Sequence, residues 1–584
     1  MLLRAAAVRW SVPVEELSTA DSRVKHASSG RSAGYEELIQ AAMQLEPPQR
    51  PALKAPANYR IVGTPRNRLD VPAKVDGSAV YAVDVRLPGM LHAALIAAPV
   101  FGGRLESVDS APALARAGVK RVVELEQAVA VVAETRWQAE TALAALSPRF
   151  GTAGHESFTS AAWFDQQQQA LRTERGDKDH VVGDVDAALA NGGRRIEAEY
   201  RVPYLYHATM EPMCATVRIA DGRAEIWTGV QDPLQTRRRV AKVSGINAEL
   251  VTVHNHPSGG GFGRRMPLEG DYVEQATRIA MAMSPVPIKL MWSREQDVRH
   301  GFYRPAVSAR FQGAVSAAGA PLAWRGRFTG RSEGAAARPL YAIPHQDIRS
   351  VPMESHVPEG PWRSVAFSQH GFFVEAFFDE LANAAGVDPL EFRRAHLGEQ
   401  PRHRAVLERI KTLSAWATTP RSSVDANAGL RRGRGVALIE SFGSIVAEVC
   451  DVAVASDGAV RVERVVAVVD CGIVINPDTA KAQIEGGILF GLSAALAEEI
   501  TLASGAVVQQ NFHDYPLLRL NEAPTVEVEF IASTAPPGGL GEPGTPPIAP
   551  ALVNAVFAAT GVRVRALPLA ASTAMLRATA PTAG

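Results

Sequence analysis

The chain has 584 residues, of which 46% are hydrophobic and 21% charged, and this length suggests roughly three or four domains of a globular protein. Lys plus Arg and Asp plus Glu both number 61, and this zero net charge argues against nucleic acid or an anionic membrane as the main partner. No apolar run approaches the ~20 residues that span a bilayer, so we do not expect an integral membrane protein. The three cysteines form no CxxC pair, which excludes a zinc ribbon or a four-cysteine iron–sulfur site, and small core residues are expected instead.

The first 57 residues predict two short helices, at 2–10 and 35–45, before a proline-rich segment at 47–51. Two such helices are too few for a stable domain, so we interpret 1–57 as the end of something larger. Residues 58–155 predict a small α+β module. Its expected elements are strands at 79–85, 91–97, 122–125 and 129–132 and a helix at 137–146.

Residues 156–425 carry glycine-rich turns between short strands and helices, and residues 426–584 follow a Ser/Thr-rich break. In the first part we expect strands at 196–202, 215–219, 224–228, 250–254 and 288–292 and helices at 234–244, 271–283 and 369–385. In the second part we expect strands at 446–454, 460–469 and 525–530 and helices at 479–496 and 549–560.

A single carboxylate, Glu542, lies between glycines and prolines in the sequence PPGGLGEPGTPP. Proline fixes φ and glycine permits turns that other residues cannot make, so this loop can hold Glu542 in one place. If it is also buried, its pKa would rise and it would serve as a general base. The alternative is a surface turn with one solvated glutamate.

The segment Gly259–Gly263 fails the spacing of a dinucleotide fingerprint and lacks the Lys-Ser/Thr pair of a P-loop. It offers either a row of backbone N–H groups for an anionic cofactor group or a tight turn. His254 and His256 lack a third ligand at zinc spacing, so no metal site built from protein ligands is expected. There is no GxSxG motif, so no serine hydrolase nucleophile is visible.

Five motifs in order carry a family resemblance: Gly229-Val230-Gln231, Gly259–Arg265, Gly360–Gln369, Gln483–Gly487 and Gly539–Gly544. Over nearly its whole length the chain resembles the large molybdopterin-binding subunit of the xanthine dehydrogenase/aldehyde oxidase family. Within that family, the branch that it most resembles is that of the isoquinoline 1-oxidoreductase beta subunit.

The resemblance implies an α+β fold with a small α/β hammerhead-like domain at 58–155. Two elongated molybdopterin-binding domains of mixed sheets and helices would follow, at 156–425 and at 426–584, the second with the Glu542 loop. This branch has a permuted order, with a Gly-Gln-Gly pterin-binding segment near its N-terminus. Residues 1–57 would be the C-terminal remnant of that segment, the rest being truncated or supplied by another polypeptide.

The resemblance also assigns roles to individual residues. Glu542 would be the catalytic base. The cofactor would be bound by Gln231, Gly260, Gly261, Phe262, Gly263, Arg363, Gln369 and Gln483. Met266, Trp362 and Val365 would line the substrate pocket. Purine-oxidising members have a glutamate in place of Met266 and a phenylalanine in place of Val365, so the chain favours an isoquinoline-like or nicotinate-like ring, or an aldehyde, over a purine.

The implied cofactor is molybdenum–molybdopterin in its cytosine dinucleotide form. The chain has no iron–sulfur cysteine set and no flavin or nicotinamide fingerprint, so electrons would pass to a small [2Fe-2S] subunit and then to a cytochrome c subunit. The expected reaction is hydroxylation, with water as the oxygen source, of a carbon next to nitrogen in an N-heteroaromatic substrate. Alternatives are an aldehyde dehydrogenase on the same scaffold and an inactive truncated subunit. The location would be periplasmic with a twin-arginine signal in the missing segment, and otherwise cytoplasmic.

Overall fold

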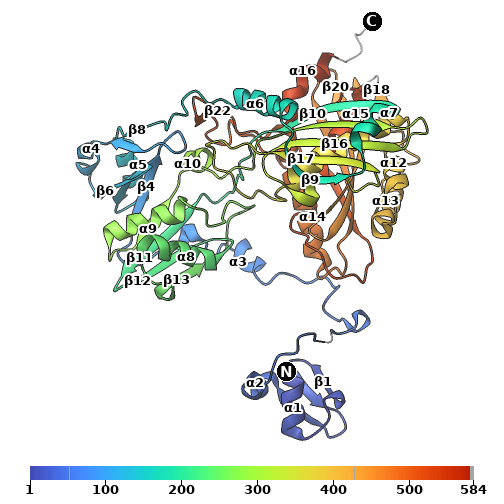
Figure 1. Cartoon of the computed structure of the whole chain (residues 1–584). Helices are drawn as coiled ribbons and strands as arrows, with labels where there is room; N and C mark the ends of the chain where they lie inside the picture. Colours follow the sequence, from blue (N-terminus) through green and yellow to red (C-terminus); the bar gives the residue numbers. More distant parts are fainter. Residues whose placement is uncertain (52, 426–427, 579–584) are drawn as a thin grey trace. The chain divides into compact units, whose positions relative to one another are not determined.

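The computed structural model describes residues 1–51, 53–425 and 428–578, and it divides into two compact units, Met1–Val62 and Gly63–Gly584 (Figure 1). In the first unit the predicted helices form as α1 (Leu2–Trp10) and α2 (Tyr35–Met43). Between them lies an antiparallel sheet that was not predicted: β1 (Leu17–Ala20), β2 (Arg23–His26) and β3 (Arg31–Gly34). Helices and sheet share a small core that includes Ala6, Val24 and Leu38.

The second unit begins with a seven-stranded mixed sheet in the order β13-β12-β11-β14-β4-β7-β6. Its strands are β4 (Leu91–Ala97), β6 (Val119–Leu125), β7 (Ala128–Ala133), β11 (Cys214–Ala220), β12 (Arg223–Thr228), β13 (Val251–Asn255) and β14 (Ile288–Met291). It is covered by α5 (Arg136–Leu143), α8 (Pro233–Ser244) and α9 (Tyr272–Met283). The sheet joins strands from both sides of the predicted boundary at residue 155, because β4 pairs in parallel with β14.

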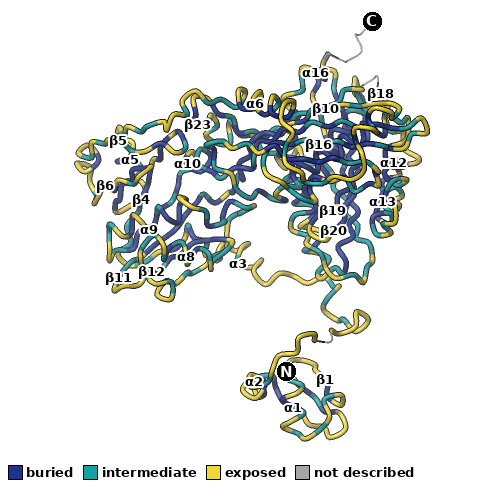
Figure 2. Tube along the Cα trace, in the orientation of Figure 1, coloured by how far each residue is buried: buried dark blue, intermediate teal, exposed yellow. Residues whose placement is uncertain are grey.

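The second unit also contains two five-stranded mixed sheets, and α11 (Phe367–Ala385) packs against both. One sheet contains β9 (Asp177–Val182), β10 (Arg194–Val202), β15 (Val307–Val315), β16 (Pro321–Thr329) and β17 (His345–Val351). The other contains β18 (Ser422–Asp425), β19 (Leu430–Ser441), β20 (Ser444–Ala455), β21 (Val460–Asp470) and β24 (Thr525–Phe530). Figure 2 shows that burial concentrates along β16, β19 and β20, which contribute to one large hydrophobic core.

Helix α15 (Ile548–Thr560) lies directly on β19 because two glycines of that strand let the backbones touch. A Cβ on Gly433 or Gly435 would lie 2.2 Å from a carbonyl oxygen of α15. Helix α13 (Pro401–Leu413) packs on β20 and β21, and α14 (Pro477–Ala497) packs on β24 and α15. The loop that carries Glu542 connects β24 to α15, so both of its ends are anchored in this core.

One predicted strand, at 79–85, is wrong. This stretch forms only a short 3₁₀ turn, η3 (Ala82–Asp84), because side chains bind its backbone in place of a neighbouring strand. The Val83 N–H donates to Glu211 Oε1 (3.2 Å), and Lys289 Nζ donates to the Val83 carbonyl (2.7 Å). All three cysteines are free and buried, as predicted.

Other elements were not predicted, among them α6 (Ser160–Thr173), α7 (Val185–Asn191), β15 to β17 and α13. Among the described residues no helix is both long and apolar enough to cross a bilayer. The domain boundaries at 57, 155 and 425 stay predictions, as does the interpretation of residues 1–57 as a remnant.

Candidate active site

Glu542 is held by Ser364, the first residue after Arg363. The Ser364 N–H donates to Glu542 Oε1 (3.1 Å), and the Ser364 hydroxyl donates to the Glu542 carbonyl (2.7 Å). The preceding glycines are tied to the turn between β19 and β20, since the Gly539 N–H donates to the Phe442 carbonyl (2.8 Å) and the Ser444 hydroxyl to that of Gly539 (2.6 Å). The carboxylate is therefore fixed in place while its side chain stays partly accessible.

Arg363 connects the Glu542 loop to α14. Its Nε donates to the Gly541 carbonyl (2.7 Å), and its Nη2 donates to Gln483 Oε1 (3.2 Å) and to the Gln483 carbonyl (3.1 Å). Burial lowers the pKa of Arg363, although the nearby Glu542 acts in the opposite direction. The structure thus brings Glu542, Arg363 and Gln483 together from three distant parts of the sequence.

The backbone between Arg363 and α11 is strained. Ser364 (φ 79°) and Val365 (φ 41°) both lie in the left-handed region, which is costly for residues with a Cβ and especially for a β-branched one. The bonds from Ser364 to Glu542 and from the Val365 N–H to the Trp362 carbonyl (2.7 Å) hold this conformation. Strain of this kind clusters at functional sites, where the surroundings must maintain it.

The glycine-rich segment is organised by Gln231 and by a buried ion pair. Gln231 Oε1 accepts from the N–H groups of Gly263 (3.1 Å) and Arg265 (3.3 Å). The Arg265 guanidinium donates to the Gly260 carbonyl (2.6 Å) and to Glu211 Oε2 (2.9 Å), and Glu211 also accepts from the Gly259 N–H (2.9 Å). Neither Glu211 nor Arg265 was assigned a role from the sequence. Glu211 follows the Tyr-His-Ala-Thr-Met stretch and directly precedes Pro212. A carboxylate before a proline is the one signal that the sequence offers there.

The glycine-rich segment also touches the Trp362 turn. A Cβ on Gly263 (φ 108°) would lie 1.8 Å from the Pro361 carbonyl oxygen, so only glycine fits there. The buried His207 donates from Nε2 to the same oxygen (2.8 Å), and its burial lowers its pKa to about 3.

Aromatic stacking joins the same two segments through Phe490 of α14. Its ring stacks on Phe262 and on Trp362, with ring centroids 4.6 Å apart in both cases. Phe490 was missed in the sequence, where it is the one aromatic residue of a helix rich in small residues.

A cavity of about 340 Å³ adjoins the Trp362 turn and is lined by Trp362, Val365 and Gln369 among others. Gln369 is buried, and its Oε1 accepts from the Ser368 hydroxyl (2.9 Å). Met266 does not line this cavity, whereas Leu268 does. None of the glycine-segment residues lines it either, although Pro361, whose carbonyl oxygen Gly263 approaches, does.

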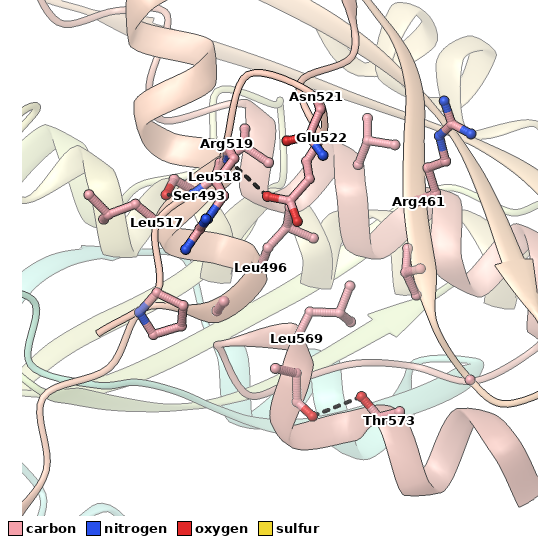
Figure 3. A pocket seen from close by; sticks show the side chains of 16 residues that line it. Arg461, Ser493, Leu496, Leu517, Leu518, Arg519, Asn521, Glu522, Leu569 and Thr573 are labelled. Carbon is pink, nitrogen blue, oxygen red and sulfur yellow. Dashed lines mark hydrogen bonds between the residues drawn. The ribbon is translucent and has the colours of Figure 1, made fainter. Parts of the chain in front are cut away.

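A larger cavity of about 650 Å³ lies elsewhere, between α14, β21 and the segment at 516–522 (Figure 3). Arg461, Leu518 and Leu569 are among its lining residues, and the Arg519 N–H donates to Glu522 Oε2 (2.9 Å). None of the residues predicted for the site lines it, so its size does not make it the active site.

Hydrogen-bond donors without a partner gather at the site. In the described part of the chain no hydrogen bond uses Gln231 Nε2, Gln483 Nε2, Arg363 Nη1 or the backbone N–H groups of Gly260, Gly261 and Phe262. A set made of donors suits an anionic group rich in oxygen atoms. These residues therefore fit a phosphate-bearing pterin cofactor.

Comparison with known proteins identifies the family. Models of a molybdopterin cofactor-binding domain match residues 165–397 and 399–524. The beta subunit of isoquinoline 1-oxidoreductase from Brevundimonas diminuta is 32% identical over 646 residues, covering 100% of this chain and 82% of the relative. The chain belongs to the xanthine dehydrogenase/aldehyde oxidoreductase family. It is a molybdopterin-binding large subunit of these molybdenum-dependent oxidoreductases, as the motifs predicted.

Two further proteins are similar to this chain. One of the subunits of nicotinate dehydrogenase from Pseudomonas putida is 30% identical, and the match covers 98% of this chain and 51% of that protein. Quinoline 2-oxidoreductase from Pseudomonas putida 86 superposes with a TM-score of 0.77 at 16% identity, covering 89% of this chain and 99% of the other. The predicted α+β class with mixed sheets is confirmed.

Proposed function

We propose that this subunit hydroxylates a carbon next to nitrogen in an N-heteroaromatic ring, with water as the oxygen source. The observation that carries the proposal is the convergence of Glu542, Arg363 and Gln483 on the turn at 362–365, whose Trp362 and Val365 line a cavity of about 340 Å³. A cavity of this size accommodates a small ring compound. Relatives named for isoquinoline and nicotinate support the same substrate class.

Glu542 is the general base in this proposal. The Ser364 N–H steadies its Oε1, which leaves Oε2 as the atom that takes the proton. Gln231, Gly260, Gly261, Phe262 and Gln483 hold the cofactor through donors that the described residues leave free, and Gly263 shapes the same segment, its N–H donating to Gln231. Arg363 fixes the spacing between the cofactor and Glu542. Gln369 stands behind this group in the cavity wall. When bound, molybdopterin supplies the redox chemistry and the oxygen transfer.

The proposal also covers the form of the cofactor, the path of the electrons and the residues on the substrate side. The cofactor is the cytosine dinucleotide form, which the row of donors at Gly260–Phe262 would hold by its phosphates. Electrons leave through a small [2Fe-2S] subunit and then a cytochrome c subunit, because the three cysteines of this chain are dispersed and buried. Trp362 and Val365 shape the substrate side, and Met266, assigned to the same pocket from the resemblance, lies outside the lining of this cavity.

The test is metal analysis and turnover of the chain co-expressed with its electron-transfer partners. We expect about one molybdenum per chain and faster turnover of isoquinoline than of benzaldehyde. Faster turnover of the aldehyde would favour the aldehyde dehydrogenase alternative. A folded complex without molybdenum would support an inactive subunit and refute the proposal.

A further inference from the structure

The cavity beside Trp362 is lined by both apolar and charged side chains. Leu268, Val307, Met353, Trp362 and Val365 supply apolar walls. Its charged side chains are Arg304, Arg331, Glu333 and Glu359. An apolar slot with a few polar groups is the usual form of a site for a small ring compound, in which the polar groups set the orientation.

Of these charged groups, Arg304 is already engaged by the protein. It is buried, it donates from Nη2 to the Pro203 carbonyl (3.0 Å), and its guanidinium lies 5.5 Å from the centre of the Trp362 ring. Burial lowers its pKa to about 9. Arg304 therefore supports the indole wall, and its Nε is buried without a hydrogen-bond partner among the described residues.

Glu359 is different, because neither of its carboxylate oxygens has a hydrogen bond or an ion pair with any described residue. It directly precedes the Gly360–Val365 turn, so it lies on the same segment as Trp362 and Arg363. Its side chain is accessible within the cavity, yet desolvation by the surrounding protein raises its pKa to about 7, with Arg331 opposing and Glu333 adding to the rise.

We propose that Glu359 binds the ring nitrogen of the substrate and so selects N-heteroaromatic compounds without a carboxylate. The proposal rests on the proposed function, whose substrate class it narrows. As an acid, Glu359 donates to an unprotonated ring nitrogen, and as a carboxylate it accepts from a protonated one, so ring and glutamate share one proton in either case. A carboxylate on the ring would instead face both Glu359 and Glu333.

The remaining groups around Glu359 do not reverse this preference. Arg331 is exposed, and its charge is offset by Glu333 on the same segment. His370 of α11 also lines the cavity, and burial lowers its pKa to about 3, so it is neutral near pH 7. The net charge facing the ring therefore changes chiefly with Glu359 between pH 6 and 8.

The test compares the wild-type complex with Glu359→Gln and with Glu354→Gln, an exposed glutamate of the same segment that does not line the cavity. Isoquinoline and nicotinate are the probes. Equilibrium binding is followed by quenching of tryptophan fluorescence, which requires no turnover, and KM and kcat are measured in parallel. For Glu359→Gln we expect the Kd and KM of isoquinoline at pH 7 to rise about 10-fold, with kcat changed much less.

Two further results are expected of Glu359→Gln. The Kd of isoquinoline changes less between pH 6 and 8 than it does in the wild type, and nicotinate binds as tightly as it does to the wild type or more tightly. Glu354→Gln behaves like the wild type. An unchanged isoquinoline Kd in folded Glu359→Gln, or a wild type that prefers nicotinate, overturns the proposal.

Glu359→Asp is the second variant if Glu359→Gln does not fold. It keeps the carboxylate but withdraws it by one methylene, so isoquinoline must bind more weakly, and unchanged binding overturns the proposal. If isoquinoline binds and Glu359→Gln weakens it but neither protein oxidises it, the inference about Glu359 stands while the proposed reaction fails.

Discussion

Glu542 owes its position to Ser364 more than to Gly541, the residue directly before it. A Cβ on Gly541 would meet nothing within 4 Å, whereas the two bonds from Ser364 fix both the carboxylate and the carbonyl of Glu542. The most closely approached glycine of the site is Gly263, where a Cβ would lie 1.8 Å from the Pro361 carbonyl oxygen. Single-residue effects at this site therefore depend on contacts between segments that are far apart in the sequence.

Substitution of Gly263 should separate the glycine-rich segment from the Trp362 turn. In Gly263→Ala the new Cβ would lie 1.8 Å from the Pro361 oxygen, and φ is 108°, so we expect destabilisation of more than about 3 kcal/mol and loss of bound molybdenum. Gly561→Ala is the control, because φ is also positive (74°) but the site is open, so only about 1 kcal/mol should be lost. Equal thermal stability and molybdenum content in the two variants would contradict this account.

Glu498 makes stability depend on pH. It is 2% exposed, its Oε2 lies 2.9 Å from the Tyr515 hydroxyl, and burial raises its pKa to about 7. Because the folded state holds a proton that the unfolded state releases above about pH 4.5, this stabilisation is complete below that pH and is lost as pH rises through 7.

Glu498→Gln removes this dependence. The melting temperature of the variant minus that of the wild type should be larger at pH 8 than at pH 5. The corresponding difference in the free energy of unfolding should grow by an amount on the order of 1–3 kcal/mol. The exposed Glu354→Gln should show no such trend. A Glu498→Gln difference that is constant from pH 5 to 8 would disprove the assignment.

At the scale of elements, the helices near the site begin at residues that the sequence makes recognisable. Asp232 directly follows Gln231 and caps α8, its side chain accepting from the Gln235 N–H (2.9 Å), with Pro233 at the first helical position. Asp388 caps α12 (Pro389–His396) in the same way. A cap so close to Gln231 ties the orientation of that side chain to the start of α8.

Removal of the α8 cap should loosen the helix locally. Asp232→Ala is expected to cost about 1 kcal/mol and to speed hydrogen exchange in residues 233–244 about fivefold. Asp184→Ala, which removes the cap of α7, should leave exchange in α8 unchanged. If the exchange of α8 responds equally to both variants, the local role of Asp232 is wrong.

Elements with a strong local signal could be predicted from the sequence, and those that depend on distant partners could not. The alternating strands around residues 446–469 and the long helix ending at Ala385 formed as expected. The segment 79–85 has strand-like composition, but Glu211 and Lys289 bind its backbone, and no local pattern reveals this. The strands β1 to β3 have four residues each, too few for alternation to stand out.

The same limit applies to the site. The resemblance selected Gln231, Arg363, Gln483 and Glu542, and the structure brings the last three together through direct hydrogen bonds around Arg363 and Ser364. Their supporting residues were missed, because Ser364, Glu211 and Phe490 are ordinary in sequence and gain meaning only through contacts across the fold.

At the scale of the whole molecule, the chain consists of two units, each with its own core. The residues before their boundary at 62 include exposed basic side chains, among them Arg50 and Lys54, outside any helix or strand. The site described above belongs entirely to the second unit.

Limited trypsin digestion should therefore cut first at Lys54, because Arg50 is followed by Pro51 and trypsin does not cleave efficiently before proline. Exposed backbone without regular hydrogen bonds is the preferred substrate of proteases. Mass spectrometry should find an early large fragment that begins at residue 55. An early cut inside residues 91–578 that leaves Lys54 intact would contradict the division.

The most direct test of the catalytic assignment is the turnover rate of Glu542→Gln per bound molybdenum, in the complex with its partners. Gln keeps the size of the side chain and an oxygen that can accept from the Ser364 N–H, so folding and molybdenum content should match the wild type. The rate per molybdenum should fall by about 10²–10⁴-fold, because the base is lost. An unchanged rate per molybdenum would show that Glu542 is not the base.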